Sequence, residues 1–287
     1  MNRHLLELHW LNNELGPGAR RRDWPDATAI GSAIPNETLN ILFVTATPRN
    51  PDQLIRNARE FFGPHSVWRV TAPERLAGSV GPVALDLGMQ PAAPVPRMVL
   101  RPIPEPSPVP AGLEIRPVTS EAGLRDFRLA GGRGFQIPRW ILRIAIPELP
   151  SSLDAHGVRL GFWVGYCQGS PVATSALLTR DGIGGVYFVG TVPEARRRGY
   201  GTALTWAAIE AARREGATVC YLQASLMGRG VYERMGFRRV DDYHDWVTAS
   251  SGPAQFRALG KLLGLALRPR NRRPAPTASV SEPPPKD

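Results

Sequence analysis

Prolines occupy every second position from residue 102 to residue 110 of this chain. Because proline has no backbone N–H and a fixed φ, this repeat fits neither a helix nor a central strand, and it predicts a stiff, extended connector. With 287 residues, the chain has room for a compact domain on each side of the connector. We therefore predict a first domain at 1–101, a linker at 102–111, a second domain at 112–248 and a tail at 249–287.

The tail carries much of the positive charge of the chain. The formal net charge is +10, and residues 251–287 hold seven basic residues against two acidic ones, which is half of the excess. An excess of basic residues most often indicates an ordinary solvated surface, so nucleic acid is not the expected partner. Association of residues 251–273 with nucleic acid is the alternative. The proline, arginine and serine content predicts that most of the tail is disordered.

The remaining composition indicates a cytoplasmic protein without a metal site. Cys167 and Cys220 lie in apolar stretches that lack metal-ligand spacing, so we expect buried, reduced thiols and no disulfide. The N-terminal residues lack the apolar core of a signal peptide. No window reaches the ~18 apolar residues that span a bilayer, so no membrane span is expected.

Hydrophobic periodicity predicts three strands and two helices in the first domain. The helix at 51–62 begins after Asn50 with a proline in its first turn, whereas the helix at 73–84 is weakened by glycines. Helical spacing also appears at 3–13, followed by a loop to about residue 35. The strands are expected at 38–45, 66–70 and 97–101.

The second domain has a longer series of strand and helix patterns. A turn at 168–170 joins two alternating runs, which predicts a hairpin. Strands are expected at 112–117, 158–167, 171–179, 186–192, 219–224 and 237–246. Helices are expected at 120–130, 140–144, 200–214 and 230–235. This order predicts an α+β fold in which helices flank a mixed, mostly antiparallel sheet.

One stretch of the second domain points to chemistry. Arg196-Arg197-Arg198-Gly199-Tyr200-Gly201 joins a predicted strand to the helix at 200–214. Glycines let the main chain approach a ligand closely, and a helix N-terminus directs unpaired N–H groups at an anion. The arginines add positive charge beside the positive end of the helix dipole. The stretch therefore predicts a phosphate-binding site, with a solvated basic turn as the alternative.

This stretch resembles the cofactor signature of the GNAT N-acetyltransferase family, Gln/Arg-x-x-Gly-x-Gly/Ala. About thirty residues on, the family has Asn-x6-Tyr-x3-Gly-Phe, and this chain has Ser225, Tyr232, Gly236 and Phe237 at the same spacing. Two motifs at the right separation, with a helix and a strand between them, are a specific signal. Residues 112–247 thus resemble a GNAT domain in element order and in both motifs.

The resemblance implies acetyl-CoA as cosubstrate, no metal, and transfer of the acetyl group to the amine of a small molecule or peptide. The pyrophosphate would lie on the loop and first helical turn, and Val189, Gly190 and Thr191 would pair with the pantetheine arm. The implied cofactor-binding residues are Val189, Gly190, Thr191, Arg196, Arg197, Arg198, Gly199, Tyr200, Gly201, Thr202 and Ser225. Tyr232 would act as the acid that protonates the leaving thiolate. The alternatives are that Tyr232 is a core residue and that Ser225 caps the turn after it.

The chain departs from the family pattern in one respect. Many members carry a glutamate early in the fourth strand as general base, and residues 184–188 contain no carboxylate. Glu194 lies beyond that strand, beside the phosphate loop, and His244 is more typical of an exposed strand residue. The base is therefore unassigned. A non-catalytic CoA-binding or regulatory module is the alternative to an enzyme, and the sequence assigns no oligomeric state.

The first domain resembles a degenerate second GNAT copy, which predicts a tandem arrangement. Its strand-helix-strand-helix-strand order repeats that of residues 186–246, and residues 86–89 stand where 235–237 stand in the second copy. The corresponding loop lacks the glycine pair, and Pro48 and Pro51 remove N–H groups that a pyrophosphate would need. We expect this copy to shape the acceptor cleft without binding CoA.

Overall fold

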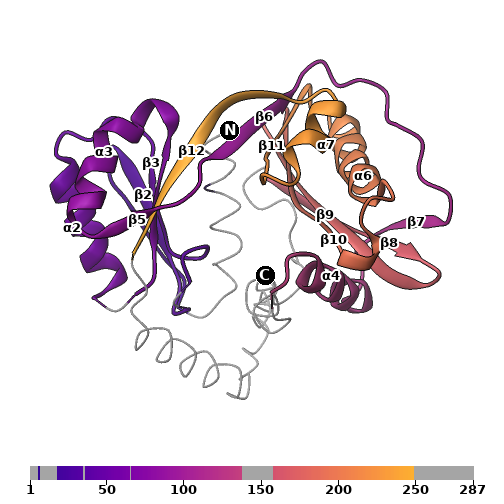
Figure 1. The fold of residues 1–287 in the computed structure, drawn as a ribbon, viewed down its shortest axis with the longest axis horizontal. Helices are drawn as coiled ribbons and strands as arrows, with labels where there is room; N and C mark the ends of the chain where they lie inside the picture. The colour runs from indigo at the N-terminus through magenta and orange to yellow at the C-terminus, as the bar shows by residue number, and fades with distance from the viewer. Residues whose placement is uncertain (1–5, 7–17, 35, 65, 138–157, 249–287) are drawn as a thin grey trace, which may run out of the picture.

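The protein is described from a computed structural model that covers residue 6 and residues 18–34, 36–64, 66–137 and 158–248. The predicted helix at 140–144, the tail and nearly all of the predicted helix at 3–13 lie outside these residues. The described residues form two lobes that share one twelve-stranded sheet (Figure 1). The sheet is mixed and mostly antiparallel, as predicted.

The first lobe contains two strands that the sequence analysis missed. The predicted loop ending near residue 35 is wrong, because it contains β1 (Arg20–Asp23) and β2 (Ala27–Gly31). β1 is fully charged and β2 is buried at every residue, so neither strand shows the alternation of a half-buried strand. The other elements are β3 (Ile41–Val44), α2 (Pro51–Phe62), β4 (Arg69–Pro73), α3 (Glu74–Asp86), β5 (Met89–Pro91) and β6 (Val95–Leu100).

The second lobe follows the predicted order closely. Its elements are β7 (Leu113–Pro117), α4 (Glu121–Gly134), β8 (Arg159–Cys167), β9 (Ser170–Arg180), β10 (Ile183–Thr191), η2 (Pro193–Ala195), α6 (Tyr200–Arg214), β11 (Val219–Gln223), α7 (Arg229–Arg234) and β12 (Arg238–Thr248). The main difference is that α4 runs four residues past its predicted end. Gly134 permits this, because a Cβ there would lie only 3.1 Å from the backbone nitrogen of Thr191.

The two lobes exchange their last strands. The sheet order is β1-β2-β3-β4-β12-β6-β11-β10-β9-β8-β7, and the twelfth strand, β5, pairs with β12 beside this path. β6, from the first half of the chain, therefore lies between β11 and β12, while β12 continues the first lobe by pairing with β4. The proline-rich segment 102–111 contains no helix or strand and is mostly exposed. The sheet is thus shared between the predicted domains, and their limits stay a prediction from the sequence.

Helices cover both faces of the sheet (Figure 1). In the first lobe, α2 and α3 bury Ile55 and Val80 against β2, β3 and β4. In the second lobe, α6 buries Trp206 and Ile209 against β10 and β11. α4 covers the opposite face, where Phe127 packs against β8 and β9. These layers fix the position of the loop between β10 and α6.

Candidate functional site

The strand β10 leaves one of its edges unpaired. It pairs with β9 as far as Thr191, but it pairs with β11 only over Ile183–Gly185. The register with β9 shifts between Tyr187 and Gly190, and Phe188 has a φ of +49°. A bulge of this kind increases strand twist and turns the strand away from its neighbour. The backbone of β10 beyond Gly185 is therefore available to an extended ligand.

The loop after β10 leads into α6, and no side chain caps the N-terminus of that helix. Gly199 is the N-cap in the left-handed conformation, with φ +77° and no capping side chain, and Arg197 also has a positive φ of +62°. Among the described residues, no group accepts a hydrogen bond from the backbone N–H groups of residues 197–202. These N–H groups and the positive end of the α6 dipole form the predicted anion-binding arrangement.

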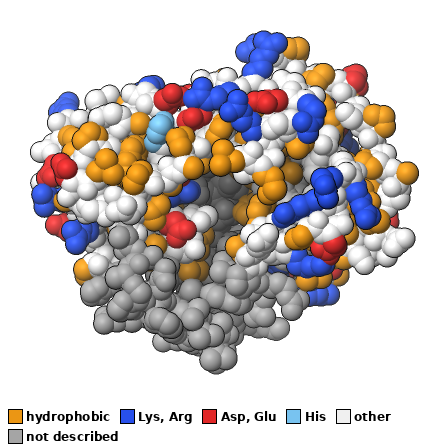
Figure 2. Space-filling model, viewed as in Figure 1, with side chains coloured by type: hydrophobic (Ala, Val, Ile, Leu, Met, Phe, Trp, Pro, Cys, Tyr) orange, Lys and Arg blue, Asp and Glu red, His pale blue; other side chains and the backbone are white. Residues whose placement is uncertain are grey.

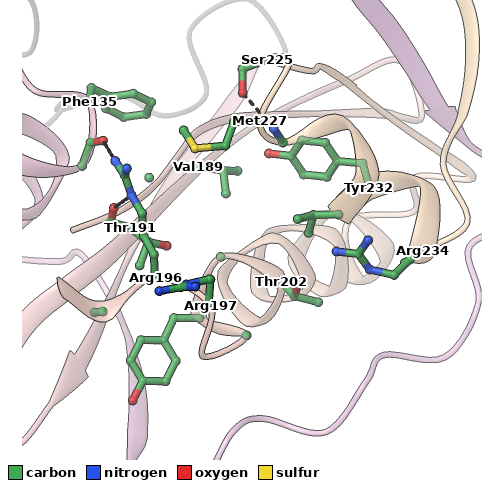
Figure 3. Close-up of a pocket in the computed structure, with 18 of the residues that line it drawn as sticks. Phe135, Val189, Thr191, Arg196, Arg197, Thr202, Ser225, Met227, Tyr232 and Arg234 are labelled. Carbon is green, nitrogen blue, oxygen red and sulfur yellow. Dashed lines mark hydrogen bonds between the residues drawn. The ribbon is translucent and has the colours of Figure 1, made fainter. Parts of the chain in front are cut away.

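A cavity of about 740 Å³ brings these two features together (Figure 3). The loop, the first turn of α6 and the end of β10 form one wall, and the segment from β11 to α7 forms another. The predicted site residues that line it are Val189, Gly190, Thr191, Arg196, Arg197, Gly199, Tyr200, Gly201, Thr202, Ser225 and Tyr232. Arg198 is exposed and is not among the lining residues.

Two of the predicted residues use their side chains for structure. The Arg196 guanidinium donates hydrogen bonds to the carbonyl oxygens of Thr191 at 3.2 Å and Gly134 at 3.0 Å, and so ties the end of α4 to β10. The Tyr200 side chain is buried, and its hydroxyl donates to the sulfur of Cys167 at 3.4 Å. Tyr200 can therefore contribute only its backbone to an anion.

Tyr232 lies on α7 and lines the cavity. Its ring is 8 % exposed and packs edge-to-face on Phe237 at 5.8 Å. The hydroxyl points into the cavity (Figure 3), and none of the described residues forms a hydrogen bond with it. Burial raises the pKa of Tyr232 to about 12, so the hydroxyl stays protonated at neutral pH.

Ser225 serves as a turn-capping residue. Its Oγ accepts a hydrogen bond from the Gly228 N–H at 3.1 Å, and its carbonyl oxygen accepts from Arg229. The side chain still lines the cavity at the start of the segment that leads to α7 (Figure 3). The capping role that the sequence left open is thus observed, and a cofactor contact stays a prediction.

Several lining residues were not anticipated from the sequence. Phe135 follows α4, contacts Phe188 edge-to-face at 6.4 Å and closes over Gly190. It falls between the predicted helices at 120–130 and 140–144, where the sequence analysis expects no element. Other lining residues occupy variable positions within the second motif, between Ser225 and Phe237. The motif therefore indicates that they lie near the site but does not predict what they do there. The additional lining residues are Gly134, Phe135, Gln136, Ala195, Met227, Gly228, Val231 and Arg234.

No acidic or histidine side chain lines the cavity among the described residues. Glu194 is exposed, and a hydrogen bond from its own backbone together with the ion pair to Arg133 lowers its pKa. His244 lies on β12 and stacks on Trp246 at 6.3 Å, opposite Ala72 of the first lobe. Neither residue is placed to act as a base in this cavity.

The opposite face of the sheet carries a buried polar group between the lobes. The hydroxyls of Tyr187 and Tyr221 hydrogen-bond to each other, and Arg97 binds both Asp241 and the Tyr243 hydroxyl. These residues come from four neighbouring strands, β10, β11, β6 and β12. Figure 2 shows a hollow between the two lobes, bordered by hydrophobic side chains. Strands from both halves of the chain thus contribute to this buried polar group.

The described residues contain no group of three or more His, Cys, Asp or Glu residues that could hold a metal ion. None of their helices has the length and apolarity needed to cross a membrane.

Comparison with known proteins assigns part of the chain to a family. Residues 135–237 match the family described as acetyltransferase (GNAT). No protein with a curated description matches the chain.

The fold is similar to several solved structures. A GCN5-related N-acetyltransferase from Kribbella flavida is 21 % identical with a TM-score of 0.66, covering 88 % of this chain and 97 % of that one. The corresponding protein from Sphaerobacter thermophilus is 15 % identical with a TM-score of 0.57, covering 78 % and 80 %. A tandem GNAT protein from the clavulanic acid biosynthesis pathway is 14 % identical with a TM-score of 0.58, covering 87 % and 95 %. At these identities the likeness concerns the fold, including the two-lobed arrangement.

Proposed function

From the match of residues 135–237 to the GNAT acetyltransferase family, we propose that the chain is an acetyl-CoA-dependent N-acetyltransferase. It transfers the acetyl group directly to the amine of a small molecule or peptide. The observation that carries the proposal is the row of unpaired N–H groups at residues 197–202, which opens into the same cavity as the free edge of β10. Together they fit a ligand that joins a diphosphate to an extended, amide-rich arm.

Each part of the cavity fits one part of CoA. The loop N–H groups and the α6 dipole bind the pyrophosphate, with Arg197 adding charge at the same wall. Backbone groups of Val189 to Thr191 pair with the pantetheine amides along the free edge of β10. The thioester would then lie where β10 and β11 separate, on the side of the cavity that Tyr232 faces.

The reaction in this site is a nucleophilic acyl substitution. The amine nitrogen attacks the thioester carbonyl carbon, a C–N bond forms, and the C–S bond breaks with the electron pair leaving on sulfur. Tyr232 donates its proton to that sulfur, and the ammonium proton passes to water. Burial makes the Tyr232 hydroxyl a weaker acid than an ordinary tyrosine, so the proton moves as negative charge develops on sulfur.

The alternative, a CoA-binding module without catalysis, has one observation in its favour. Among the described residues, the cavity lining offers no carboxylate or imidazole that could accept the ammonium proton. An acceptor whose amine is already neutral, or deprotonation by water, would remove this requirement. Acetylation of any amine in a broad acceptor panel would exclude the non-catalytic alternative.

Calorimetric titration with CoA tests the proposal, using two glycines that flank α6. Gly199 and Gly216 both have positive φ, +77° and +83°, so alanine imposes a similar backbone cost of about 1–2 kcal/mol at either position. We expect Gly199→Ala to weaken CoA binding by about tenfold or more, since it distorts the phosphate loop. Gly216→Ala, at the far end of the helix, should leave the affinity within about twofold. Absence of CoA binding by the wild-type chain would end the proposal.

A further inference from the structure

The proline-rich segment 102–111 forms a strap that contacts α6 near each end of the helix. Within this strap, Ile103 and Pro110 are the two residues that are not exposed. In Figure 1 the strap leaves β6, passes along the side of the second lobe that carries α6, and reaches β7. The strap therefore lies beside the helix whose N-terminus forms the proposed anion site.

The first anchor of the strap is at the C-terminal end of α6. The Arg213 guanidinium donates hydrogen bonds to the carbonyl oxygens of Ile103 at 3.1 Å and Pro104 at 2.7 Å. It also pairs with the Glu105 carboxylate at 3.3 Å. The Ile103 side chain packs against the core cluster that contains Ile209 of α6. Three consecutive strap residues are therefore fixed to this end of the helix.

The second anchor is Pro110, at the N-terminus of the same helix. A Cβ added to Gly199 would lie 3.2 Å from Cγ of Pro110. Among the described residues, and leaving aside the chain neighbours of Gly199 and the backbone of α6, only Pro110 comes within 4 Å of that point. Pro110 does not line the cavity, so its ring supports the glycine from outside the site.

The turn after Pro110 holds its ring in place. The Leu113 N–H donates a hydrogen bond to the Pro110 carbonyl oxygen at 3.2 Å, and Gly112 has a φ of +76° within the turn. The Leu113 side chain is buried in the core cluster that contains Tyr200 and Leu204, from the beginning of α6. Pro110 is therefore held against the start of α6 by the strand that follows it.

The strap has little slack between its two anchors. A chain in the polyproline II conformation spans about 22 Å from Ile103 to Pro110, at about 3.1 Å per residue. The helix spans about 21 Å from Gly199 to Arg213, at about 1.5 Å per residue. These lengths match, and the alternate prolines restrict φ along the strap. Pro110 therefore has little freedom to move away from Gly199.

We propose that Pro110 is a positioning residue for CoA binding, because its ring holds Gly199 in the left-handed conformation from which the loop N–H groups open into the cavity. Glycine has wide φ and ψ freedom, so an unsupported Gly199 would lose more entropy when a ligand orders the loop. A loop that is ordered before the ligand arrives binds more tightly, because this cost is lower. The inference rests on the proposed function, since CoA is the ligand concerned.

The alternative is that the strap is only a covalent connection between β6 and β7. In that case Pro110 and Pro106 are equivalent for CoA binding, because both are strap prolines outside the cavity lining. The proposal predicts that they differ, since Pro110 contacts Gly199 and Pro106 is exposed. CoA affinity therefore separates the two roles.

Calorimetric titration with CoA tests the proposal on wild type and three variants. Pro110→Ala removes the Cγ contact and should weaken CoA binding by about fivefold, the loss expected when one loop residue must be ordered by the ligand. Pro110→Val keeps carbon atoms at the γ position and should stay within about twofold of wild type. Pro106→Ala is the matched control, because it makes the same change at an exposed residue, and it should also stay within about twofold. Thermal unfolding of the same preparations shows that each variant is folded during the titration.

The outcomes distinguish the inference from the proposed function. If wild type binds CoA and Pro110→Ala binds it equally well, or if Pro106→Ala loses as much affinity as Pro110→Ala, the role of Pro110 is overturned while the proposed function stands. An equal loss in Pro110→Val and Pro110→Ala also overturns it, since the fixed φ of proline would then matter and the contact with Gly199 would not. If wild type does not bind CoA, the proposed function fails and the inference fails with it.

Discussion

The junction between β3 and α2 and the junction between β10 and α6 have the same topology, but they differ in the backbone and side-chain groups that they present. β3 runs parallel to β4 and antiparallel to β2, and β10 runs parallel to β11 and antiparallel to β9. A helix follows each junction strand, α2 after β3 and α6 after β10. The two halves of the chain are also related by their last strands. β6, from the first half, pairs with β11 of the second, and β12, from the second half, pairs with β4 of the first.

The N-termini of α2 and α6 differ in whether a side chain caps them. At α2, the Asn50 side chain accepts a hydrogen bond from the Gln53 N–H at 2.9 Å, and Pro51 has no N–H to offer. At α6, Gly199 provides no capping side chain and the N–H groups open into a cavity. An equivalent fold position is therefore an ordinary helix cap in one lobe and the proposed anion site in the other.

The strand edge and the helix that follows also differ. β3 ends at Val44, one residue beyond its pairing with β4, whereas β10 continues for six residues beyond its pairing with β11. The positive-φ glycines Gly88 and Gly236 end corresponding turns, and the residue four positions earlier is Ala84 in the first lobe but Tyr232 in the second. The fold alone therefore does not make the site; side chains and strand length at three positions do.

The largest predicted effect comes at high pH and concerns the second half of the chain, because all six tyrosines lie between residues 166 and 243. Burial raises the pKa of Tyr232 and of Tyr243 to about 12. A raised native-state pKa stabilises the fold below the unfolded-state value near 10, and this contribution is lost as pH rises toward 12. At about 1.4 kcal/mol per pH unit for each tyrosine, these two residues alone should cost about 5 kcal/mol by pH 12.

Urea unfolding between pH 8 and pH 11.5 measures this loss, and phenolate absorbance reports ionisation. The free energy of unfolding should begin to fall near pH 10, and Tyr232→Phe should make that fall shallower. Phenolate absorbance from all six tyrosines at pH 10, in a chain that is still folded, would contradict the burial seen here.

The second prediction concerns the residue that the first lobe lacks. Tyr232→Phe should lower kcat by about 100-fold, because general acid catalysis typically contributes a factor of this size or more. CoA affinity should be unchanged, since the ring and its packing on Phe237 are retained. Tyr166→Phe is the control, because its hydroxyl bonds to Asp126 outside the cavity. Equal turnover of wild type and Tyr232→Phe would remove Tyr232 from the acid role.

The sequence predicted the second lobe better than the first for a physical reason. The elements around the phosphate loop have clear periodicity and glycine punctuation, so their order could be predicted with small errors in their ends. β1 is fully charged and β2 is buried at every residue, so both lack the alternation of a half-buried strand. The pairing of β6 with β11 and β12 could not be predicted either, because the alternation of residues within a strand does not specify which strands lie beside it.

The site shows the same division. Backbone-based features, such as the open helix N-terminus, follow from residue types at fixed spacing. Side-chain roles depend on the surroundings, and here the sequence was less informative. Arg196 proved to bind carbonyl oxygens, and Phe135 and Arg234 line the cavity without a motif to mark them. Neighbours distant in sequence decide such roles.

The smallest predicted effect concerns the closed junction in the first lobe. Asn50→Ala removes the side-chain acceptor for the Gln53 N–H, so it should lower the free energy of unfolding by about 1 kcal/mol. It should leave CoA affinity and turnover unchanged, because α2 presents a structural cap and no ligand site. Thermal unfolding and CoA titration of the same preparation measure both quantities. Weaker CoA binding in this variant would show that the two junctions are coupled through the shared sheet. The difference between a capped and an uncapped helix N-terminus would then not be enough to explain the proposed location of the CoA site.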